Sequence, residues 1–374
     1  MRHFIPTRVV FGRKAVNRLS EEISYLNLNT KRTAVICGSS AVSLGYTKKI
    51  SEQIEGEVKV FPLVKEDPTV ENAEEVLKEV KEFSPTLIVA VGGGSPLDVS
   101  KVVSVMLENE GNIREFIGIP EVFKRPGVPL VAVPTTSGSG SEVTPFAVLT
   151  DREKLRKAPL ISRFLFPALA IDDPELTISM PQFVTANTGI DALTHSIEAF
   201  LSKRATPISR LYSLESMKLI LNYLPRAFGN PKDIEAREKV MLGSLLGGMA
   251  IADAGAGLVH TLAHILGVLY RVPHGLSNGI FLVPVLEFYG LSIKDKLEEI
   301  GNYIGMGRNS HGFLNFLKEF LSFLGVPQKA STVGLKEDDI SLFISLAMEK
   351  KHLMGSLPRI PSERDLRVIL EELM

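Results

Sequence analysis

The stretch Leu87–Leu107, LIVAVGGGSPLDVSKVVSVML, decides the fold of the first half of this 374-residue chain. Its apolar run Leu87–Val91 is short and rich in β-branched residues, which predicts a buried strand. Three glycines follow the run, and Pro96 then suits the first turn of a helix, where its missing N–H is not needed. The stretch therefore predicts one repeat of a parallel sheet, in which a strand passes through a glycine loop into a helix.

The same alternation of apolar runs and amphipathic helical stretches, such as Asn72–Phe83, fills the first half of the chain. The predicted strands are Thr33–Cys37, Val58–Leu63, Leu87–Val91, Leu130–Val133 and Ala168–Ile171. From about Pro181 onward, apolar residues recur at three-to-four spacing and strand signals are scarce. We therefore predict an α/β domain with a parallel sheet over residues 1–180, and an all-helical domain over residues 181–374.

Composition narrows the class of protein. The chain has 42 basic and 43 acidic residues, so its net charge of −1 provides no field that would hold nucleic acid or an anionic membrane. Cys37 is the only cysteine, and residues 1–12 lack the apolar run of a signal peptide, which together favour a reducing cytoplasmic setting. The apolar segment Met241–Tyr270 carries Asp253 and two histidines, so we expect a buried helix pair rather than a membrane span.

Five metal-competent side chains are concentrated in the helical half. Asp191 and His195 stand four residues apart, as do His260 and His264, and this spacing places each pair on one face of a helix. His274 follows in what we predict to be a short loop. One carboxylate with several neutral imidazoles is a ligand set for Zn²⁺ or Fe²⁺. A lone histidine is more often a packing or capping residue, but this clustering favours a metal site.

Two glycine-rich loops in the sheet half predict a nucleotide site. Gly92–Ser95 follows an apolar run directly, and so does the loop within Val131–Glu142, VAVPTTSGSGSE. Glycines at such turns let the backbone approach a pyrophosphate, although a tight turn without a ligand would also use them. The phosphate-loop motif of nucleotide hydrolases is absent from both loops, so a dinucleotide is favoured. We expect the dinucleotide and the metal to meet in a cleft between the two domains.

Seven blocks, in order along almost the whole chain, resemble the iron-containing, group III alcohol dehydrogenases. They are Pro6–Gly12 (PTRVVFG), Glu66–Thr69 (EDPT), Gly92–Asp98 (GGGSPLD), Pro134–Thr144 (PTTSGSGSEVT), Asp151–Lys157 (DREKLRK), Gly189–Phe200 (GIDALTHSIEAF) and Gly257–Asn278 (GLVHTLAHILG with PHGLSN). The resemblance implies an N-terminal Rossmann-like domain and a C-terminal helical domain, the architecture that dehydroquinate synthase also has. It further implies a homodimer.

The resemblance also implies a role for each metal-competent residue. It implies divalent iron bound by Asp191, His195, His260 and His274, while His264 lies near the substrate without being a permanent ligand. We take His264 as the candidate for proton transfer or for orienting the substrate. A packing role for His264 stays open. We read the remaining histidines, His3, His311 and His352, as surface or packing residues.

The residues that match cofactor contacts of the family are Asp67, Gly93, Gly94, Ser95, Asp98, Thr135, Thr136 and Lys157. Asp67 stands where many members carry asparagine, and Asp98 could instead be a residue that favours the start of a helix. Ser39 stands where members specific for NAD usually place an acidic residue that bonds the ribose. Because the chain lacks that carboxylate, we expect it to accept NADP(H) and to prefer it over NAD(H).

These expectations combine into a metal-dependent alcohol dehydrogenase or aldehyde reductase. It would transfer a hydride between NAD(P)(H) and a small alcohol or aldehyde, with Fe²⁺ polarising the substrate oxygen and Zn²⁺ as the alternative metal. Three other readings stay open: a zinc-dependent glycerol or polyol dehydrogenase, a lyase like dehydroquinate synthase, and a nucleotide-binding protein without catalytic activity.

Overall fold

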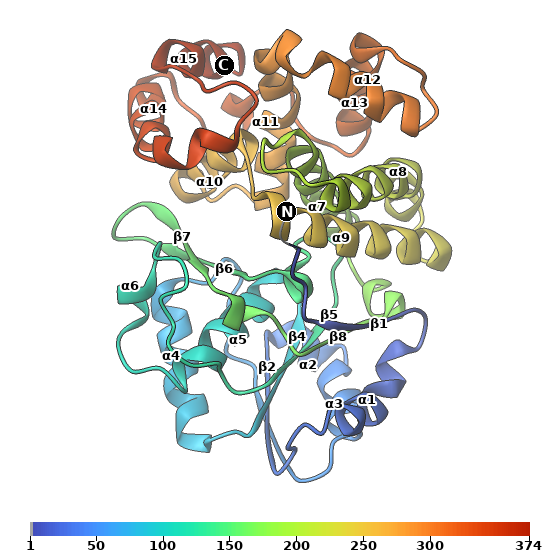
Figure 1. Ribbon diagram of the computed structural model, residues 1–374, viewed down its shortest axis with the longest axis vertical. Helices are drawn as coiled ribbons and strands as arrows, with labels where there is room; N and C mark the ends of the chain where they lie inside the picture. Colours follow the sequence, from blue (N-terminus) through green and yellow to red (C-terminus); the bar gives the residue numbers. More distant parts are fainter. Residues whose placement is uncertain (1–2) are drawn as a thin grey trace. The chain divides into compact units, whose positions relative to one another are not determined.

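The computed structural model describes residues 3–374, except for the side chains of residues 351–353, so the role expected for His352 lies outside the described residues. Contacts within the chain divide it into two units (Figure 1). One unit is residues 4–180, and the other is residues 181–374 together with His3. His3 belongs to the second unit, and its Nδ1 lies 2.7 Å from Oδ2 of Asp253 there.

Residues 4–180 form a six-stranded sheet in the order β1-β8-β5-β4-β2-β3, and every neighbouring pair is parallel. Its strands are β1 (Arg8–Phe11), β2 (Arg32–Cys37), β3 (Glu57–Phe61), β4 (Leu87–Gly92), β5 (Leu130–Pro134) and β8 (Leu169–Asp172). An antiparallel hairpin of β6 (Phe146–Asp151) and β7 (Arg156–Ile161) forms a separate two-stranded sheet. The parallel sheet of the sequence prediction is confirmed, whereas β1 and the hairpin were not predicted.

Helices cover both faces of the parallel sheet, which explains why its central strands are continuously apolar. In β4, Ile88 and Ala90 point into a core shared with α4 (Val70–Phe83) and α5 (Gly94–Met106). Leu87, Val89 and Val91 alternate with them and point into a second core, which is shared with α1 and α3. The bounds of those two helices are Leu19–Tyr25 for α1 and Tyr46–Ser51 for α3.

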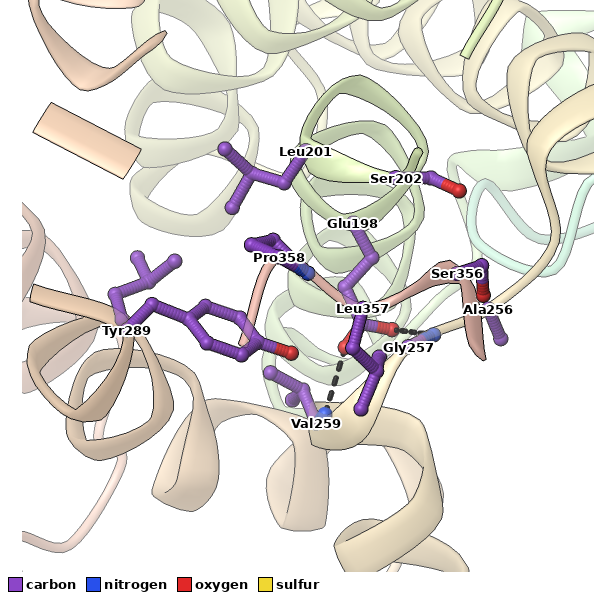
Figure 2. A pocket seen from close by; sticks show the side chains of 11 residues that line it. Glu198, Leu201, Ser202, Ala256, Gly257, Val259, Tyr289, Ser356, Leu357 and Pro358 are labelled. Atoms are coloured by element: carbon purple, nitrogen blue, oxygen red, sulfur yellow. Dashed lines mark hydrogen bonds between the residues drawn. The ribbon is translucent and has the colours of Figure 1, made fainter. Parts of the chain in front are cut away.

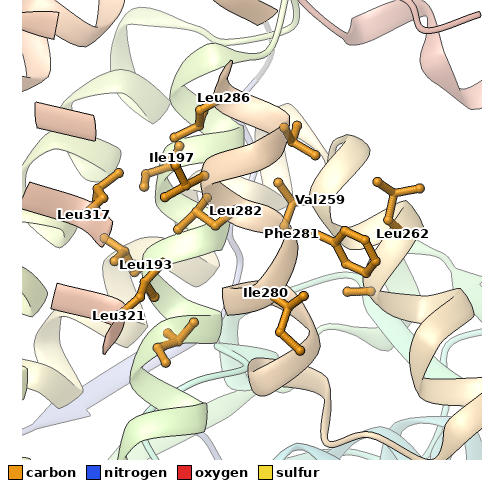
Figure 3. Packing of buried hydrophobic residues seen from close by; sticks show 14 of the residues in the cluster. Leu193, Ile197, Val259, Leu262, Ile280, Phe281, Leu282, Leu286, Leu317 and Leu321 are labelled. Atoms are coloured by element: carbon orange, nitrogen blue, oxygen red, sulfur yellow. The ribbon is translucent and has the colours of Figure 1, made fainter. Parts of the chain in front are cut away.

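Residues 181–374 are helical, and no strand occurs among the described residues of this unit. Its helices are α7 (Gln182–Leu201), α8 (Pro207–Gly229), α9 (Ile234–Ala254), α10 (Leu258–Tyr270), α11 (His274–Tyr289), α12 (Lys294–Tyr303), α13 (Ser310–Phe323), α14 (Ile340–Glu349) and α15 (Glu363–Glu372). One large apolar core joins them, and Figure 3 shows side chains of α7, α10, α11 and α13 meeting within it. This core fixes α7, α10 and α11, the helices that carry the candidate metal ligands.

The apolar segment Met241–Tyr270 folds as two mostly buried helices rather than one straight span. It comprises the end of α9 and all of α10, which meet at an angle of 105°. The helical run His274–Tyr303 is apolar and long enough to cross a membrane by composition, but 61% of its most apolar window is buried. Burial against other helices accounts for the apolar character of both segments.

Candidate metal centre and cofactor loops

Three helices bring four metal-competent side chains to one point. Asp191 and His195 lie one turn apart on α7, His260 lies near the start of α10, and His274 is the first residue of α11. The Nε2 atoms of His195 and His260 are each 3.5 Å from Oδ1 of Asp191, and that of His274 is 3.3 Å from it. The four residues predicted from the sequence therefore converge on a single carboxylate oxygen.

His274 does not lie in a loop, which corrects the sequence-based expectation. It opens α11 directly after Pro273, whose φ of −53° and ψ of 139° end the preceding extended segment. Gly275 and Ser277 weaken the intrinsic helix propensity of the first turn. Burial of the residues that follow, including Ile280 and Phe281, stabilises the helix from its first residue.

The convergence fits a divalent metal ion. Ligands held about 2.0–2.1 Å from a tetrahedrally coordinated metal are separated from one another by about 3.3–3.4 Å. The three distances to Asp191 lie close to that value, and the ligand atoms of Asp191, His195 and His260 all lie within 4.8 Å of one another, a group that does not include His274. The side chains of Asp191, His195 and His260 are 11%, 10% and 4% exposed, whereas that of His274 is 35% exposed. Such a site has three buried ligands and one ligand at its open side.

Burial and mutual charge set the protonation of this group. Burial alone would raise the pKa of Asp191, but the neighbouring imidazoles, with His195 the strongest, hold that pKa well below its ordinary value. Burial lowers the pKa of His195 to about 4, so its ring is neutral near pH 7. Burial also opposes the charged form of His260, yet hydrogen bonds to Asp191 and Glu198 raise the pKa of its imidazole to about 9. An anionic carboxylate beside a neutral imidazole is suited to bind a cation.

Two further polar residues belong to this centre. The Glu198 carboxylate lies 2.6 Å from Nδ1 of His260. It also accepts hydrogen bonds from the backbone N–H groups of Gly257 and Val259 (Figure 2). Nδ2 of Asn278, a fully buried residue, donates to Oδ1 of Asp191 at 2.8 Å. Both side chains thus hold a candidate ligand in place.

His264 lies beside this group, one turn beyond His260 on α10. The centroid of its ring is 5.1 Å from that of His274 and 6.2 Å from that of His260. It is half-buried. A side chain in this position can reach a molecule bound at the more exposed side of the group, next to His274.

The two glycine-rich loops of the other unit lie against each other. Gly93 precedes α5 and Gly94 begins it, so that Ser95 lies in its first turn. A Cβ atom on Gly93 would come 3.1 Å from Oγ1 of Thr136, and one on Gly94 would come 3.1 Å from the Ser139 side chain. The N–H of Thr135 donates to the carbonyl of Gly92 at 2.9 Å. A larger residue at either position would have to displace side chains of the second loop by a few tenths of an ångström.

Ser39 lies at the same edge of the sheet as these loops. It follows β2 and is exposed at the start of a short helix, Ser39–Ser43. In the sheet, β2 pairs with β4 and β4 pairs with β5. Since parallel strands share one carboxyl edge, Ser39, the loop after β4 and the loop after β5 stand side by side, where open parallel sheets bind ligands.

The remaining predicted cofactor residues are engaged with other protein groups. Asp98 accepts hydrogen bonds from Oγ of Ser141 at 2.6 Å and from the N–H of Val148 at 2.9 Å. Asp67 forms an ion pair with Lys157, and Oγ1 of Thr150 donates to Asp67 at 2.7 Å. Asp98 therefore links α5 to the second loop and to the hairpin. The Asp67 and Lys157 pair ties the hairpin to the segment before α4.

Comparison with known proteins identifies the family. The family model "Iron-containing alcohol dehydrogenase" matches residues 6–174. The model of the C-terminal part of the Fe-containing alcohol dehydrogenase family matches residues 185–374. The chain belongs to the iron-containing alcohol dehydrogenase family. This result confirms the family predicted from the seven sequence blocks.

Several relatives match the chain along nearly their whole length. An NAD-dependent methanol dehydrogenase of Bacillus methanolicus is 32% identical, covering 98% of each chain. An NADPH-dependent butanol dehydrogenase of Clostridium saccharobutylicum is 29% identical, covering 99% of this chain and 97% of the relative. A crystal structure of 1,3-propanediol oxidoreductase is 30% identical and superposes with a TM-score of 0.94, covering 100% of this chain and 99% of the other. The fold class predicted from the sequence is thereby confirmed.

Sequence reasoning missed Glu198 and Asn278, although spacing carried a signal for both. Glu198 stands seven residues after Asp191 and three after His195, which places it on the same face of α7. Asn278 stands four residues after His274 on α11. The family resemblance implied the ligands themselves but gave no role to the residues that hold them.

Proposed function

We propose that this alcohol oxidoreductase is an Fe²⁺-dependent alcohol dehydrogenase or aldehyde reductase that transfers a hydride between NAD(P)(H) and a small alcohol or aldehyde. The observation that carries the proposal is the convergence of His195, His260 and His274 on one oxygen of Asp191. Zn²⁺ suits the same donors, because ligand identity alone does not select between these two metals.

In this proposal, Asp191, His195, His260 and His274 hold the metal. The metal, when bound, supplies Lewis acidity that favours the alkoxide form of the substrate oxygen. The chain itself limits the access of water, because three of its four ligands are buried. The half-buried His264 orients the substrate or moves a proton at its hydroxyl group, since its ring lies beside that of His274.

We place the dinucleotide at the carboxyl edge of the parallel sheet. The backbone of Gly93, Gly94 and Ser95 at the start of α5 would face the pyrophosphate, with Thr135 and Thr136 beside it. Asp67, Asp98 and Lys157 are the further candidate contacts. The closeness of the two loops supports this placement.

We propose that NADP(H) is accepted and preferred, because Ser39 presents no carboxylate to repel a 2′-phosphate. The relatives include an NAD-dependent methanol dehydrogenase and an NADPH-dependent butanol dehydrogenase, so both cofactors occur in the family. We also propose a cytoplasmic homodimer. The buried, single Cys37 supports the compartment, and the family resemblance supports the dimer.

The competing readings differ in metal and reaction. A zinc polyol dehydrogenase would typically use three protein ligands, whereas the approach of three imidazoles to Asp191 supports four ligands here. A lyase would not reduce NAD(P)⁺ when supplied with an alcohol, and a nucleotide-binding protein without catalytic activity would convert none of the substrates. The test is elemental analysis of anaerobically purified protein, followed by assays of primary alcohols, diols and aldehydes with both cofactors. Absence of metal-dependent oxidoreductase activity across that panel would reject the proposal.

A further inference from the structure

We propose that Glu198 is a positioning residue that holds His260 with its Nε2 atom directed at the metal. The inference rests on the metal site of the proposed function. Glu198 lies on α7 and is 5% exposed, and its carboxylate reaches across to the beginning of α10. No role was predicted for it from the sequence.

The Glu198 carboxylate is held by backbone N–H groups, which can only donate hydrogen bonds. Oε2 accepts from the backbone N–H of Gly257 at 2.7 Å, and Oε1 accepts from that of Val259 at 2.6 Å. These N–H groups belong to the start of α10, where the helix leaves them without carbonyl partners. Glycine at 257 permits this approach, because a Cβ atom there would lie 2.6 Å from Oε1. The position of Glu198 is therefore fixed without any contribution from the imidazole.

The third contact then decides which nitrogen of His260 carries a proton. Nδ1 lies 2.6 Å from Oε2, and an ionised carboxylate only accepts hydrogen bonds. Nδ1 is therefore the donor to Glu198, so the nitrogen whose proton a metal displaces is Nε2, the atom 3.5 Å from Asp191. The Nδ1 atom of His195 has no hydrogen-bond partner among the described residues, so His195 lacks the anchor that His260 has.

The surroundings of Glu198 strengthen the contact. Figure 2 shows its carboxylate at a small cavity that Leu201, Tyr289 and Leu357 also line. Tyr289 is 3% exposed and Leu357 is 4% exposed, so little water competes for the carboxylate oxygens. A hydrogen bond in such a poorly polarisable setting is stronger than the same bond in water.

The substitution Glu198→Gln tests the inference, because no orientation of the amide satisfies all three donors. If the amide oxygen accepts from Val259, its NH₂ group faces the N–H of Gly257 and can donate to Nδ1, which forces the proton of His260 onto Nε2. If the amide is turned, its NH₂ group opposes the N–H of Val259. The matched control is Asp233→Asn, because Asp233 caps α9 of the same unit by accepting from Ala236 at 3.0 Å.

The readouts are the dissociation constant of Co²⁺, titrated into metal-free protein and followed by absorption, and the melting temperature without metal. We expect Glu198→Gln to bind Co²⁺ about 10–100-fold more weakly, as is usual when the partner of a metal-binding histidine is removed. Asp233→Asn should melt earlier but bind as the wild type does. If Glu198→Gln melts earlier and binds with unchanged affinity, Glu198 is only a helix cap and the inference is wrong.

A second measurement keeps the inference testable if Glu198→Gln does not fold. In zinc-loaded wild-type protein labelled with ¹⁵N-histidine, nuclear magnetic resonance should show a proton on Nδ1 of His260 and zinc on Nε2. Zinc on Nδ1 would overturn the inference while leaving the metal site intact. If the wild type binds neither Co²⁺ nor Zn²⁺, the proposed function itself fails.

Discussion

Replacing Gly275 by alanine should damage the metal centre through a steric contact that the structure locates. A Cβ atom at this position would lie 1.8 Å from the carbonyl oxygen of Asn187 and 2.5 Å from its carbonyl carbon. Carbon and oxygen atoms in contact are ordinarily separated by about 3.3 Å or more. The start of α11 and the middle of α7 would therefore have to separate by about 1.5 Å, the difference between these two distances.

That movement acts on two candidate ligands at once. Gly275 directly follows His274, and Asn187 lies one turn before Asp191. Metal sites tolerate displacements of about 0.2 Å in their ligand distances, so His274 could not stay a ligand after a shift of this size. We expect the free energy of unfolding to fall by about 1–3 kcal/mol from overpacking. We expect metal affinity to fall on the order of 100-fold, which corresponds to about 3 kcal/mol.

The control is Gly229→Ala at the last residue of α8, where a Cβ atom would meet nothing within 4 Å. Its stability should be unchanged or higher by about 0.4–1 kcal/mol, because alanine reduces the freedom of the unfolded chain. Co²⁺ titration and thermal unfolding of both variants provide the assay. Gly275→Ala protein with the metal affinity and melting temperature of the wild type would refute the packing deduced for α7 and α11.

Three further predictions concern the cofactor, the substrate and stability. Ser39→Asp should lower the ratio of kcat/KM with NADP(H) to that with NAD(H) by about 10-fold or more, because a carboxylate repels the 2′-phosphate and a 10-fold change corresponds to about 1.4 kcal/mol. An unchanged ratio would show that Ser39 does not influence the choice of cofactor. His264→Ala should keep its metal, measured by elemental analysis, but lose about 100-fold in kcat; an unaltered rate at every pH would reject its role. Burial raises the pKa of Glu142 from 4.5 to about 7. The folded protein therefore holds this proton more tightly than the unfolded chain does, and the contribution of the protonated Glu142 to stability is complete below pH 4.5 and is lost as pH rises through 7. Glu142→Gln should therefore gain on the order of 2 kcal/mol over the wild type between pH 5 and pH 8 in denaturant unfolding, and a gain that did not depend on pH would contradict the burial of an ionisable carboxyl there.

The central strands could be predicted because each is buried on both faces and is therefore continuously apolar, as β4 is. The strand β1 escaped prediction because it is a four-residue edge strand whose burial is mixed. The hairpin strand β7 escaped because it contains Pro159, which argues against a strand interior, and because the charged turn before it resembles a loop.

Part of the metal centre was accessible from spacing alone, since Asp191 and His195 share one face of a helix. The way in which α7, α10 and α11 come together could not be predicted, because it depends on how the apolar core packs, and the spacing of residues along the sequence does not determine that packing. Asp98 is a similar case. Its place in a glycine-rich motif predicts a cofactor contact, which stays a prediction, whereas the hydrogen bonds that its oxygens accept from Ser141 and Val148 could not be predicted from spacing.

The most direct measurement is anomalous X-ray diffraction at the iron absorption edge, from crystals grown without oxygen in the presence of a ferrous salt. We predict one strong anomalous peak about 2.0–2.2 Å from a carboxylate oxygen of Asp191 and from the Nε2 atoms of three histidines. These histidines are His195, His260 and His274. Anomalous density located elsewhere, or none beside these four side chains, would contradict the account.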